Sequence, residues 1–228
     1  MTVTPQRLSE TQWRIPLGQI DRHSAAQLAD ALVTELTARG YPAAEAVVGF
    51  DAIALWGCPD EAVLSAALAA VGAKARSARL AAAAPDSDPS MPSPHSRTHE
   101  LPLIVTPETA PDLATVAEAL GRTPESILDT FLACTFTVAA VGFLPGFPFL
   151  EGLPETLVLP RRANPRLKVP AGSVAIAQRM ACIYPWESPG GWHLIGRTPV
   201  TLFDPTAMPP ARLRPGDRVR FVLREESR

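Results

Sequence analysis

A short basic segment carries the side chains of this sequence that are best suited to binding an anion. Residues 160–170, PRRANPRLKVP, contain four cations, Arg161, Arg162, Arg166 and Lys168. Because proline restricts the backbone, these side chains sit on a preorganised loop, and guanidinium forks match the oxygens of a carboxylate or phosphate. The segment is therefore a candidate anion site, and a solvated loop with surface ion pairs is the equally weighted alternative.

Three loops near this segment combine glycine, proline and polar residues: GFLPGFP (142–148), SPGGW (188–192) and IGRTP (195–199). Glycine lets backbone turn sharply or approach a ligand closely, and backbone N–H groups in such turns can bind an anion. Most glycines and prolines serve only as turn residues, which is the alternative. The candidate binding residues are Gly142, Pro145, Gly146, Ser188, Gly190, Gly191, Trp192 and Arg197, with Ser173, which enters a strand near the basic segment.

No self-contained catalytic motif accompanies these loops. The sequence has no GxxxxGK[ST], GxGxxG, GxSxG or HExxH, so any nucleotide would bind without a P-loop. His193 lies in the loop-rich region, and an ordinary strand histidine is the better interpretation. Cys58, Cys134 and Cys182 lie far apart without metal-ligand spacing, which predicts reduced thiols, a cytoplasmic protein and no metal site. The catalytic residues stay unknown.

The chain divides at a linker. Residues 85–98, PDSDPSMPSPHSRT, lack apolar periodicity and separate a front part, 1–84, from a back part, 99–228. In the front part, apolar spacing predicts a helix over 24–39, capped by Ser24 with Gln27, and strand structure over 46–56. A second helix, capped by Asp60 and stopped at Gly72, and a strand near 76–83 complete a small α/β domain.

The back part is predicted to be a β-barrel with two helices. A strand over 101–105 precedes helices over 112–120 and from Thr123-Pro124 onward. Short apolar runs then follow at the spacing of a closed or nearly closed barrel. They are VAAVGF (138–143), TLVLP (156–160), SVAIA (173–177), WHLIG (192–196), VTLF (200–203) and RVRFVL (218–223).

Charge and hydropathy exclude two classes of partner. The helix pair resembles a DNA-reading helix-turn-helix, but residues 111–134 carry four acidic side chains and one basic side chain, a net charge of −3, which is the wrong sign for binding phosphates. The uncharged run over 130–150 is long enough to cross a bilayer, yet glycine and proline crowd its second half. We therefore expect neither nucleic-acid nor membrane binding, and the N-terminal residues predict no secretion signal.

Several blocks, in order, resemble one family. GFLPGFPFLEGLP, LPRRANPRLKVPAGSVAIA, IYPWESPGGWHLIGRTP, LFDP and LRPGDRVRF are similar to the B-type subunits of 5-oxoprolinase, also called allophanate hydrolase subunit 1, a family that includes KipI-like kinase inhibitors. The likeness spans residues 100–223, extends to part of the carboxyltransferase region of urea amidolyase, and adds Tyr184 of the IYP block to the candidate binding residues. It implies an α+β protein: an N-terminal ferredoxin-like α/β domain and a C-terminal cyclophilin-like β-barrel.

The resemblance also implies a function. Such proteins act with a C-type partner (allophanate hydrolase subunit 2), and with a separate A-type subunit, in the ATP-dependent opening of 5-oxoproline to glutamate. A lactam carbonyl is a poor electrophile, and phosphorylation of its oxygen turns that oxygen into a leaving group. The implied co-substrate is ATP, the ligand a small anion, and the chain a hydrolase subunit that is inactive without its partner. The alternative is a non-catalytic KipI-like inhibitor of a histidine kinase; prolyl isomerase activity is disfavoured, because fold alone does not grant function.

The sequence departs from the family pattern at several polar positions. A YGGE-like turn is replaced by residues 105–108, beginning at Val105, and a histidine and a tyrosine are replaced by Phe131 and Phe136. A Gly-x-Gln-Thr-Gly turn is replaced by Gln178 to Cys182. Either this chain acts on a substrate that differs from that of the family, or the polar lining of the family's site is lost in it. With Arg166 as the leading ligand contact, Arg166→Ala is expected to weaken binding and to leave the melting temperature nearly unchanged.

Overall fold

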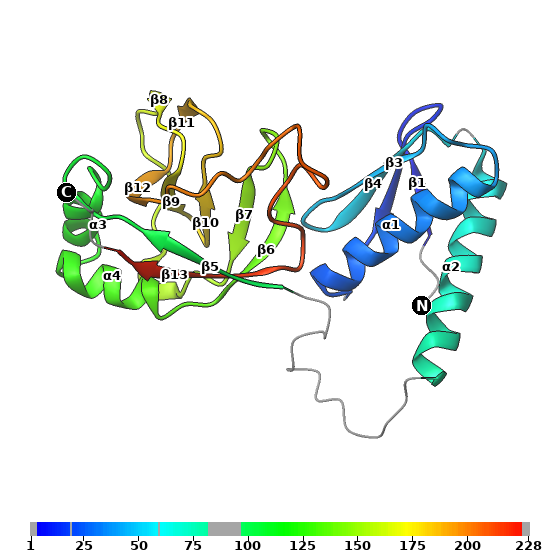
Figure 1. Cartoon of the computed structure of the whole chain (residues 1–228), viewed down its shortest axis with the longest axis horizontal. Coiled ribbons are helices and arrows are strands. Elements are labelled where there is room, and N and C mark those ends of the chain that lie inside the picture. Colours follow the sequence, from blue (N-terminus) through cyan, green and yellow to red (C-terminus); the bar gives the residue numbers. More distant parts are fainter. Residues whose placement is uncertain (1–3, 19, 59, 82–96, 225–228) are drawn as a thin grey trace. The chain divides into compact units, whose positions relative to one another are not determined.

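The computed structural model describes residues 4–18, 20–58, 60–81 and 97–224. The chain consists of two compact units, Met1–Ser96 (unit 1) and Arg97–Arg228 (unit 2), shown in Figure 1. The predicted linker falls mostly outside the described residues. Both units combine helices with sheets that are antiparallel except for one parallel strand pair in unit 2, so the predicted α+β class is confirmed.

Unit 1 is a four-stranded antiparallel sheet with two helices, in the strand order β1-β2-β4-β3. Trp13 and Ile15 of β2 alternate with less buried neighbours, and they share one core with Leu32 of α1 and Leu64 of α2. Both helices therefore cover the same face of the sheet. Its elements are β1 (Gln6–Arg7), β2 (Trp13–Pro16), α1 (Arg22–Ala38), β3 (Glu45–Val48), β4 (Ala52–Trp56) and α2 (Glu61–Ala81).

The bounds of these helices correct three predictions and confirm one. Asp21, not Ser24, is the N-cap of α1, and its carboxylate accepts a hydrogen bond from the Ser24 amide at 2.9 Å. Asp60 accepts from the Ala62 amide at 2.7 Å, as predicted for the start of the second helix. The predicted stop at Gly72 and the strand near 76–83 are wrong, because α2 continues to Ala81 through an alanine-rich segment whose helix propensity outweighs one glycine.

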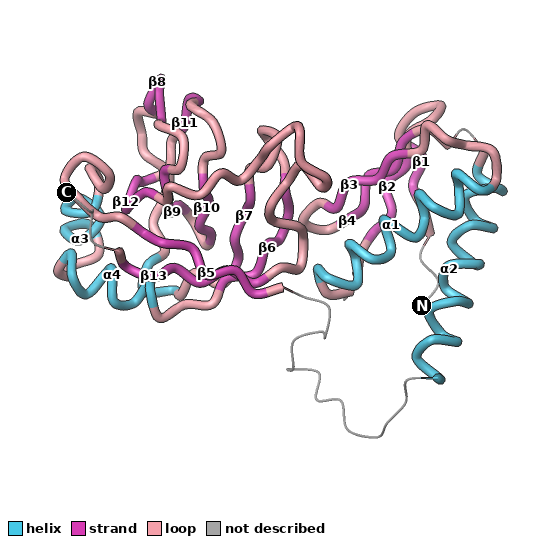
Figure 2. Tube along the Cα trace, viewed as in Figure 1, coloured by secondary structure: helices cyan, strands magenta, loops and turns pink. Residues whose placement is uncertain are grey.

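Unit 2 is built on a seven-stranded sheet in the order β12-β9-β10-β7-β6-β13-β5, with a separate two-stranded ribbon of β11 and β8 (Figure 2). The two helices lie against one end of it, α4 next to β13 and α3 next to β12. Its elements are β5 (Thr98–Leu103), α3 (Leu113–Ala119), α4 (Pro124–Leu132), β6 (Phe136–Val141), β7 (Pro148–Glu151), a 3-10 turn (Glu155–Leu157), β8 (Arg166–Val169), β9 (Ser173–Ala177), β10 (Met180–Ile183), β11 (Ser188–Gly190), β12 (His193–Arg197) and β13 (Arg218–Leu223).

The two edges of the seven-stranded sheet meet just beyond β5, which nearly closes it into a barrel. Ile104 and Arg197 form an isolated bridge, with N–O distances of 2.8 and 2.9 Å between their backbones. Gly196 is needed at this junction, since a Cβ there would lie 2.5 Å from the side chain of Leu103. The bridge leaves few unpaired backbone groups where the edge strands approach each other.

Strands β9 and β10 are buried on both faces, and this two-sided burial creates the candidate site. Val174 and Ile176 belong to the barrel interior, whereas Ala175 and Ala177, which alternate with them, belong to a second cluster that includes Phe147 and Trp192. A strand buried on only one face would alternate with polar residues. The second cluster lies beneath the β8–β11 ribbon and the loop before β7.

Two of the predicted barrel strands do not form. Residues 156–160 contribute a 3-10 turn and one bridge from Leu159 to Gln178, and residues 200–203 contribute one bridge from Phe203 to Ala211. Prolines at 154, 160, 199 and 205 bound both runs, remove ladder donors and prevent them from extending. Among the described residues, none of the helices combines the length and the apolar character that a membrane crossing needs.

Candidate functional site

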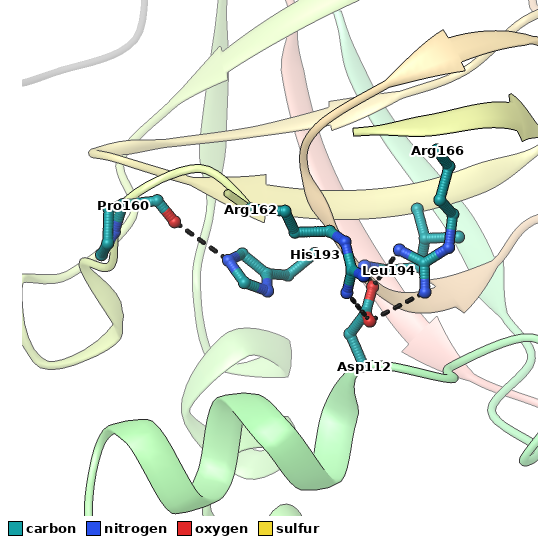
Figure 3. A network of polar contacts seen from close by, with 6 residues as sticks. All are labelled: Asp112, Pro160, Arg162, Arg166, His193 and Leu194. Carbon is teal, nitrogen blue, oxygen red and sulfur yellow. Dashed lines mark hydrogen bonds and ion pairs between the residues drawn. The ribbon is translucent and has the colours of Figure 1, made fainter. Parts of the chain in front are cut away.

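Asp112, immediately before α3, holds two arginines of the basic segment in place (Figure 3). Arg166 donates from both terminal nitrogens, at 2.7 Å to Oδ2 and 2.8 Å to Oδ1, and Arg162 donates to Oδ1 at 2.5 Å. The backbone amide of Leu194, in β12, donates to Oδ2 at 2.8 Å. Asp112 makes no capping bond to its own helix, so its carboxylate links the basic segment to the barrel.

The arginine clamp, formed by Arg162 and Arg166 around Asp112, carries more positive than negative charge. The Asp112 side chain is only 4% exposed, while those of Arg162 and Arg166 are 28% and 25% exposed. Burial alone would raise the pKa of Asp112, but the hydrogen bonds from Arg166 and the Leu194 amide and the charges of both arginines outweigh it and lower the pKa. One carboxylate faces two cations, which leaves a net positive charge at the clamp.

Two buried polar atoms beside the clamp lack a partner among the described residues. His193 Nε2 lies 2.9 Å from the Pro160 carbonyl, to which it must donate, so in the neutral ring Nδ1 is an acceptor. That Nδ1 and the Nε of Arg162 are both buried without a protein hydrogen bond. A buried donor and a buried acceptor normally find a partner, so a water molecule or a ligand atom fits this place.

A pocket of about 150 Å³ lies over the outer face of β9 and β10. The basic segment supplies one wall, the β8–β11 ribbon another, and the loop before β7 a third. The residues that line it are Phe143, Phe147, Phe149, Arg161, Tyr184, Pro189, Gly190, Gly191 and Trp192. Five of them, Arg161, Tyr184, Gly190, Gly191 and Trp192, were predicted site residues.

Arg161 differs from the other cations of its segment. Its guanidinium carbon lies 5.7 Å from the centroid of the Trp192 ring, a cation–π distance. Arg162 and Arg166 bind Asp112, and Lys168 pairs with Glu187 at 3.3 Å on an exposed surface. Within the described residues, Arg161 is the cation of the segment that has no carboxylate partner, and it is the one that lines the pocket.

Tyr184 and Gly190 meet at the pocket wall. A Cβ on Gly190 would lie 2.3 Å from the Tyr184 hydroxyl, so only glycine allows this approach. Burial raises the pKa of Tyr184 well above its usual range, with a smaller opposing contribution from the charge of Arg161. The phenol is therefore neutral at physiological pH, and Arg161 is the charged group of the pocket lining.

The remaining predicted site residues have other contacts. Arg197 donates from Nε to the Ala171 carbonyl at 2.8 Å, and Ser173 is buried within β9. Ser188 is buried in β11, and its hydroxyl lies 3.4 Å from the Pro189 carbonyl oxygen. The loop with Gly142, Pro145 and Gly146 is closed internally: the Gly142 amide donates to the Phe147 carbonyl, and the Pro145 carbonyl accepts from the Trp186 indole. None of these residues lines the pocket.

The departures from the family pattern lie mostly in the barrel core. Phe131 and Phe136 are fully buried, with ring centroids 5.0 Å apart, and both contact Phe221. Val105 packs against the same core. Of the segment from Gln178 to Cys182, Cys182 belongs to the cluster under the pocket. Neither phenylalanine lines the pocket.

Sequence reasoning missed Asp112 and the three pocket phenylalanines. The signal that could have indicated Asp112 was the uneven distribution of charge along the back part. Residues 99–140, which include Asp112, carry 1 basic and 6 acidic side chains, whereas residues 141–228 carry 12 basic and 7 acidic side chains. Phe143, Phe147 and Phe149 stand in the same block as the glycines that were singled out. Their type and spacing gave no sign that they line a pocket rather than fill a core.

A nucleophile–base pair does not accompany the pocket in residues 97–224. His99 contacts Asp217 at 3.0 Å, and His193 contacts the Pro160 carbonyl. Neither histidine hydrogen-bonds to a hydroxyl or a thiol among these described residues.

Unit 2 is thus a nearly closed barrel with an aromatic pocket, lined by Arg161, which has no carboxylate partner among the described residues. Residues 3–213 match the family described as "Carboxyltransferase domain, subdomain C and D", and the chain belongs to this family. The similarity predicted from the sequence blocks is confirmed by curated relatives.

The curated relatives match only part of their own length. The B-type subunit of 5-oxoprolinase from Escherichia coli O157:H7 is 47% identical over 133 residues, which are 58% of this chain and 61% of that protein. The protein of the same name from Bacillus subtilis (strain 168) is 44% identical over 126 residues, 55% of this chain and 52% of that one. The matches thus span little more than half the length of these relatives.

Solved structures share the fold of both units. The crystal structure of TTHA0988 has a TM-score of 0.72 at 31% identity and covers 95% of this chain, which corresponds to 40% of that chain. The Kluyveromyces lactis urea amidolyase has a TM-score of 0.66 at 18% identity, covering 98% of this chain and 15% of that one. The latter likeness concerns the fold alone.

Proposed function

We propose that the chain is the B-type subunit of an ATP-dependent 5-oxoprolinase-like complex, which opens a small lactam or amide with a C-type partner subunit. A separate A-type subunit completes the complex. The identity of 44–47% to proteins named as B-type subunits of 5-oxoprolinase supports the reaction class. The observation that carries the partner requirement is the pocket itself, which contains a cation and aromatic walls without a nucleophile–base pair among residues 97–224.

ATP does not fit this pocket as a whole. Pockets that enclose drug-sized ligands measure about 300–1,000 Å³, and this one measures about 150 Å³. A triphosphate would also need several cations, while Arg162 and Arg166 are engaged by Asp112. We infer that the nucleotide binds outside this pocket, at a surface that a partner chain completes.

The complex is expected in the cytoplasm, where ATP is available. Cys58, Cys134 and Cys182 are all free thiols, which fits a reducing compartment.

Co-expression with a C-type partner tests the proposal. The two chains should elute together in size exclusion, and the mixture should hydrolyse ATP only when a lactam or amide substrate is added. Separate elution and no substrate-dependent ATP hydrolysis would overturn the proposal. Inhibition of histidine-kinase autophosphorylation by the chain alone would instead favour the KipI-like alternative.

A further inference from the structure

We propose that the pocket beside Arg161 binds the substrate itself, a small planar ring amide that carries one carboxylate, of which 5-oxoproline is the example. The inference rests on the proposed function and deepens it, because it assigns the substrate to this chain and to named residues. Three observations carry it: the unpaired cation, the aromatic walls and the size of the pocket.

The cation selects the charge of the ligand. Arg161 is exposed, lines the pocket and makes no ion pair with the described residues, in contrast to Arg162, Arg166 and Lys168. Its guanidinium carbon lies 5.7 Å from the centroid of the Trp192 ring, and its nitrogens make no side-chain hydrogen bond with the described residues. A planar guanidinium edge matches a carboxylate through two parallel hydrogen bonds. One cation predicts one carboxylate rather than a polyphosphate.

The aromatic walls select the shape of the ligand. Phe147 lies between Phe149 and Tyr184, with ring centroids 5.0 and 5.1 Å away, and Phe149 lies 6.2 Å from Trp192. Flat apolar surfaces of this kind favour a small ring over an extended flexible chain. The volume of about 150 Å³ has room for a five-membered ring with its carboxylate, and not for a nucleotide.

Phe143 lines this pocket and has a strained backbone conformation. Its φ of 72° is in the left-handed region, which is unfavourable for a bulky side chain, and its side chain is 67% exposed. The ring stands edge-on to Phe147, with the two centroids 5.4 Å apart. Strained residues concentrate where a ligand is clamped. A ligand below Phe143 would bury the exposed ring and offset the unfavourable backbone conformation.

The test measures binding of small ligands to the full chain by calorimetry or NMR titration. Three probes separate the features: 5-oxoproline, 2-pyrrolidinone, which has the ring without the carboxylate, and acetate, which has the carboxylate without the ring. We expect 5-oxoproline to bind at least about tenfold more tightly than either fragment. Arg161→Ala should weaken the binding of 5-oxoproline by about ten- to a hundred-fold and leave the affinity for 2-pyrrolidinone unchanged.

Arg220→Ala is the matched control, because Arg220 is an exposed arginine on β13 and does not line the pocket. It should bind all three probes as the original chain does. The proposal is overturned if 5-oxoproline does not bind, if it binds no better than 2-pyrrolidinone, or if Arg161→Ala retains full affinity.

Different results would overturn the proposed function and the assignment of the pocket. If Arg161-dependent binding is found but the mixture with a C-type partner and an A-type subunit shows no ATP-dependent hydrolysis, the proposed function is wrong and the pocket assignment stands. If the complex containing Arg161→Ala hydrolyses 5-oxoproline with unchanged KM and kcat, the function stands and the pocket assignment is wrong.

Discussion

Arg166 donates hydrogen bonds from both terminal guanidinium nitrogens to the two carboxylate oxygens of Asp112, at 2.7 and 2.8 Å, although the two residues lie 54 positions apart in the sequence. The contact fixes the basic segment against the start of α3, next to Leu194 of β12. An arginine that looked from the sequence like a ligand contact therefore has a structural partner. Arg161 of the same segment has no carboxylate partner among the described residues.

Asp112→Asn should destabilise unit 2 strongly. The amide keeps the shape of the carboxylate but leaves two partly buried arginines without a counter-charge. Removing one partner from such a buried pair costs about 3 kcal/mol of unfolding free energy. Chemical denaturation should show this loss, with Glu187→Gln as the control, because Glu187 is in an exposed ion pair. Equal stability of Asp112→Asn and the original chain would mean that the clamp does not hold the fold.

Arg166→Ala should lower the melting temperature, which changes the expectation derived from the sequence. Arg162 and the Leu194 amide still hold Asp112, so the loss is smaller than for Asp112→Asn, about 1.5–3 kcal/mol. Arg166→Lys should recover only part of it, because an ammonium group cannot reproduce the two-pronged contact. A full loss of ligand binding with an unchanged melting temperature would show that Arg166 contacts the ligand after all.

Stability should depend on the ionisation of Asp112. Its pKa is lowered in the folded chain, although burial alone would raise it, and the unfolded carboxyl titrates near pH 3.9. The unfolded state therefore binds more protons around that pH, and stability rises with pH through this window. The contribution is complete above about pH 5 and is lost as pH falls through the folded pKa.

Thermal melts of the original chain and Asp112→Asn between pH 3 and 7 measure this dependence. The difference in melting temperature should be largest at pH 7 and should shrink below about pH 4. A difference that stays constant across this range would contradict the assignment of the acid-sensitive step to Asp112.

Gly190→Ala should destabilise the pocket wall, because the added methyl would approach the Tyr184 hydroxyl to 2.3 Å. Overpacking of this kind costs about 1–3 kcal/mol. Gly191→Ala is the matched control, since its Cβ would meet Pro165 at an ordinary 3.6 Å. Chemical denaturation measures the unfolding free energy of both variants. Equal losses of unfolding free energy at the two positions would show that the contact with Tyr184 is not what requires glycine.

The overall architecture of unit 2 was predictable, but its site was only partly so. The order of blocks from 142 to 223 fixed the family, and Thr123-Pro124 correctly marked the start of α4. Composition alone could not tell which arginines are neutralised, because Asp112 lies about 50 residues away from them in sequence. Long-range pairing of this kind depends on the closed fold rather than on any local pattern.

Local sequence patterns also led to wrong predictions at positions where the same residues fit two interpretations. Gly72 looked like a helix stop, yet the alanine-rich sequence after it continues α2 to Ala81. Phe131 and Phe136 suggested a decayed polar lining, and they are core residues that pack with Phe221. In both cases tertiary context, which the sequence does not display, decided between the alternatives.

The formation of glutamate from 5-oxoproline by this chain mixed with a C-type partner and an A-type subunit, measured together with ADP release, tests the central claim most directly. Neither this chain nor the C-type partner should be active without the other, and the mixture should form glutamate only with ATP present. Arg161→Ala should raise the KM for 5-oxoproline by about ten- to a hundred-fold, while Arg220→Ala should not. Glutamate formation by either chain without the other, or ADP release that is independent of 5-oxoproline, would contradict the account.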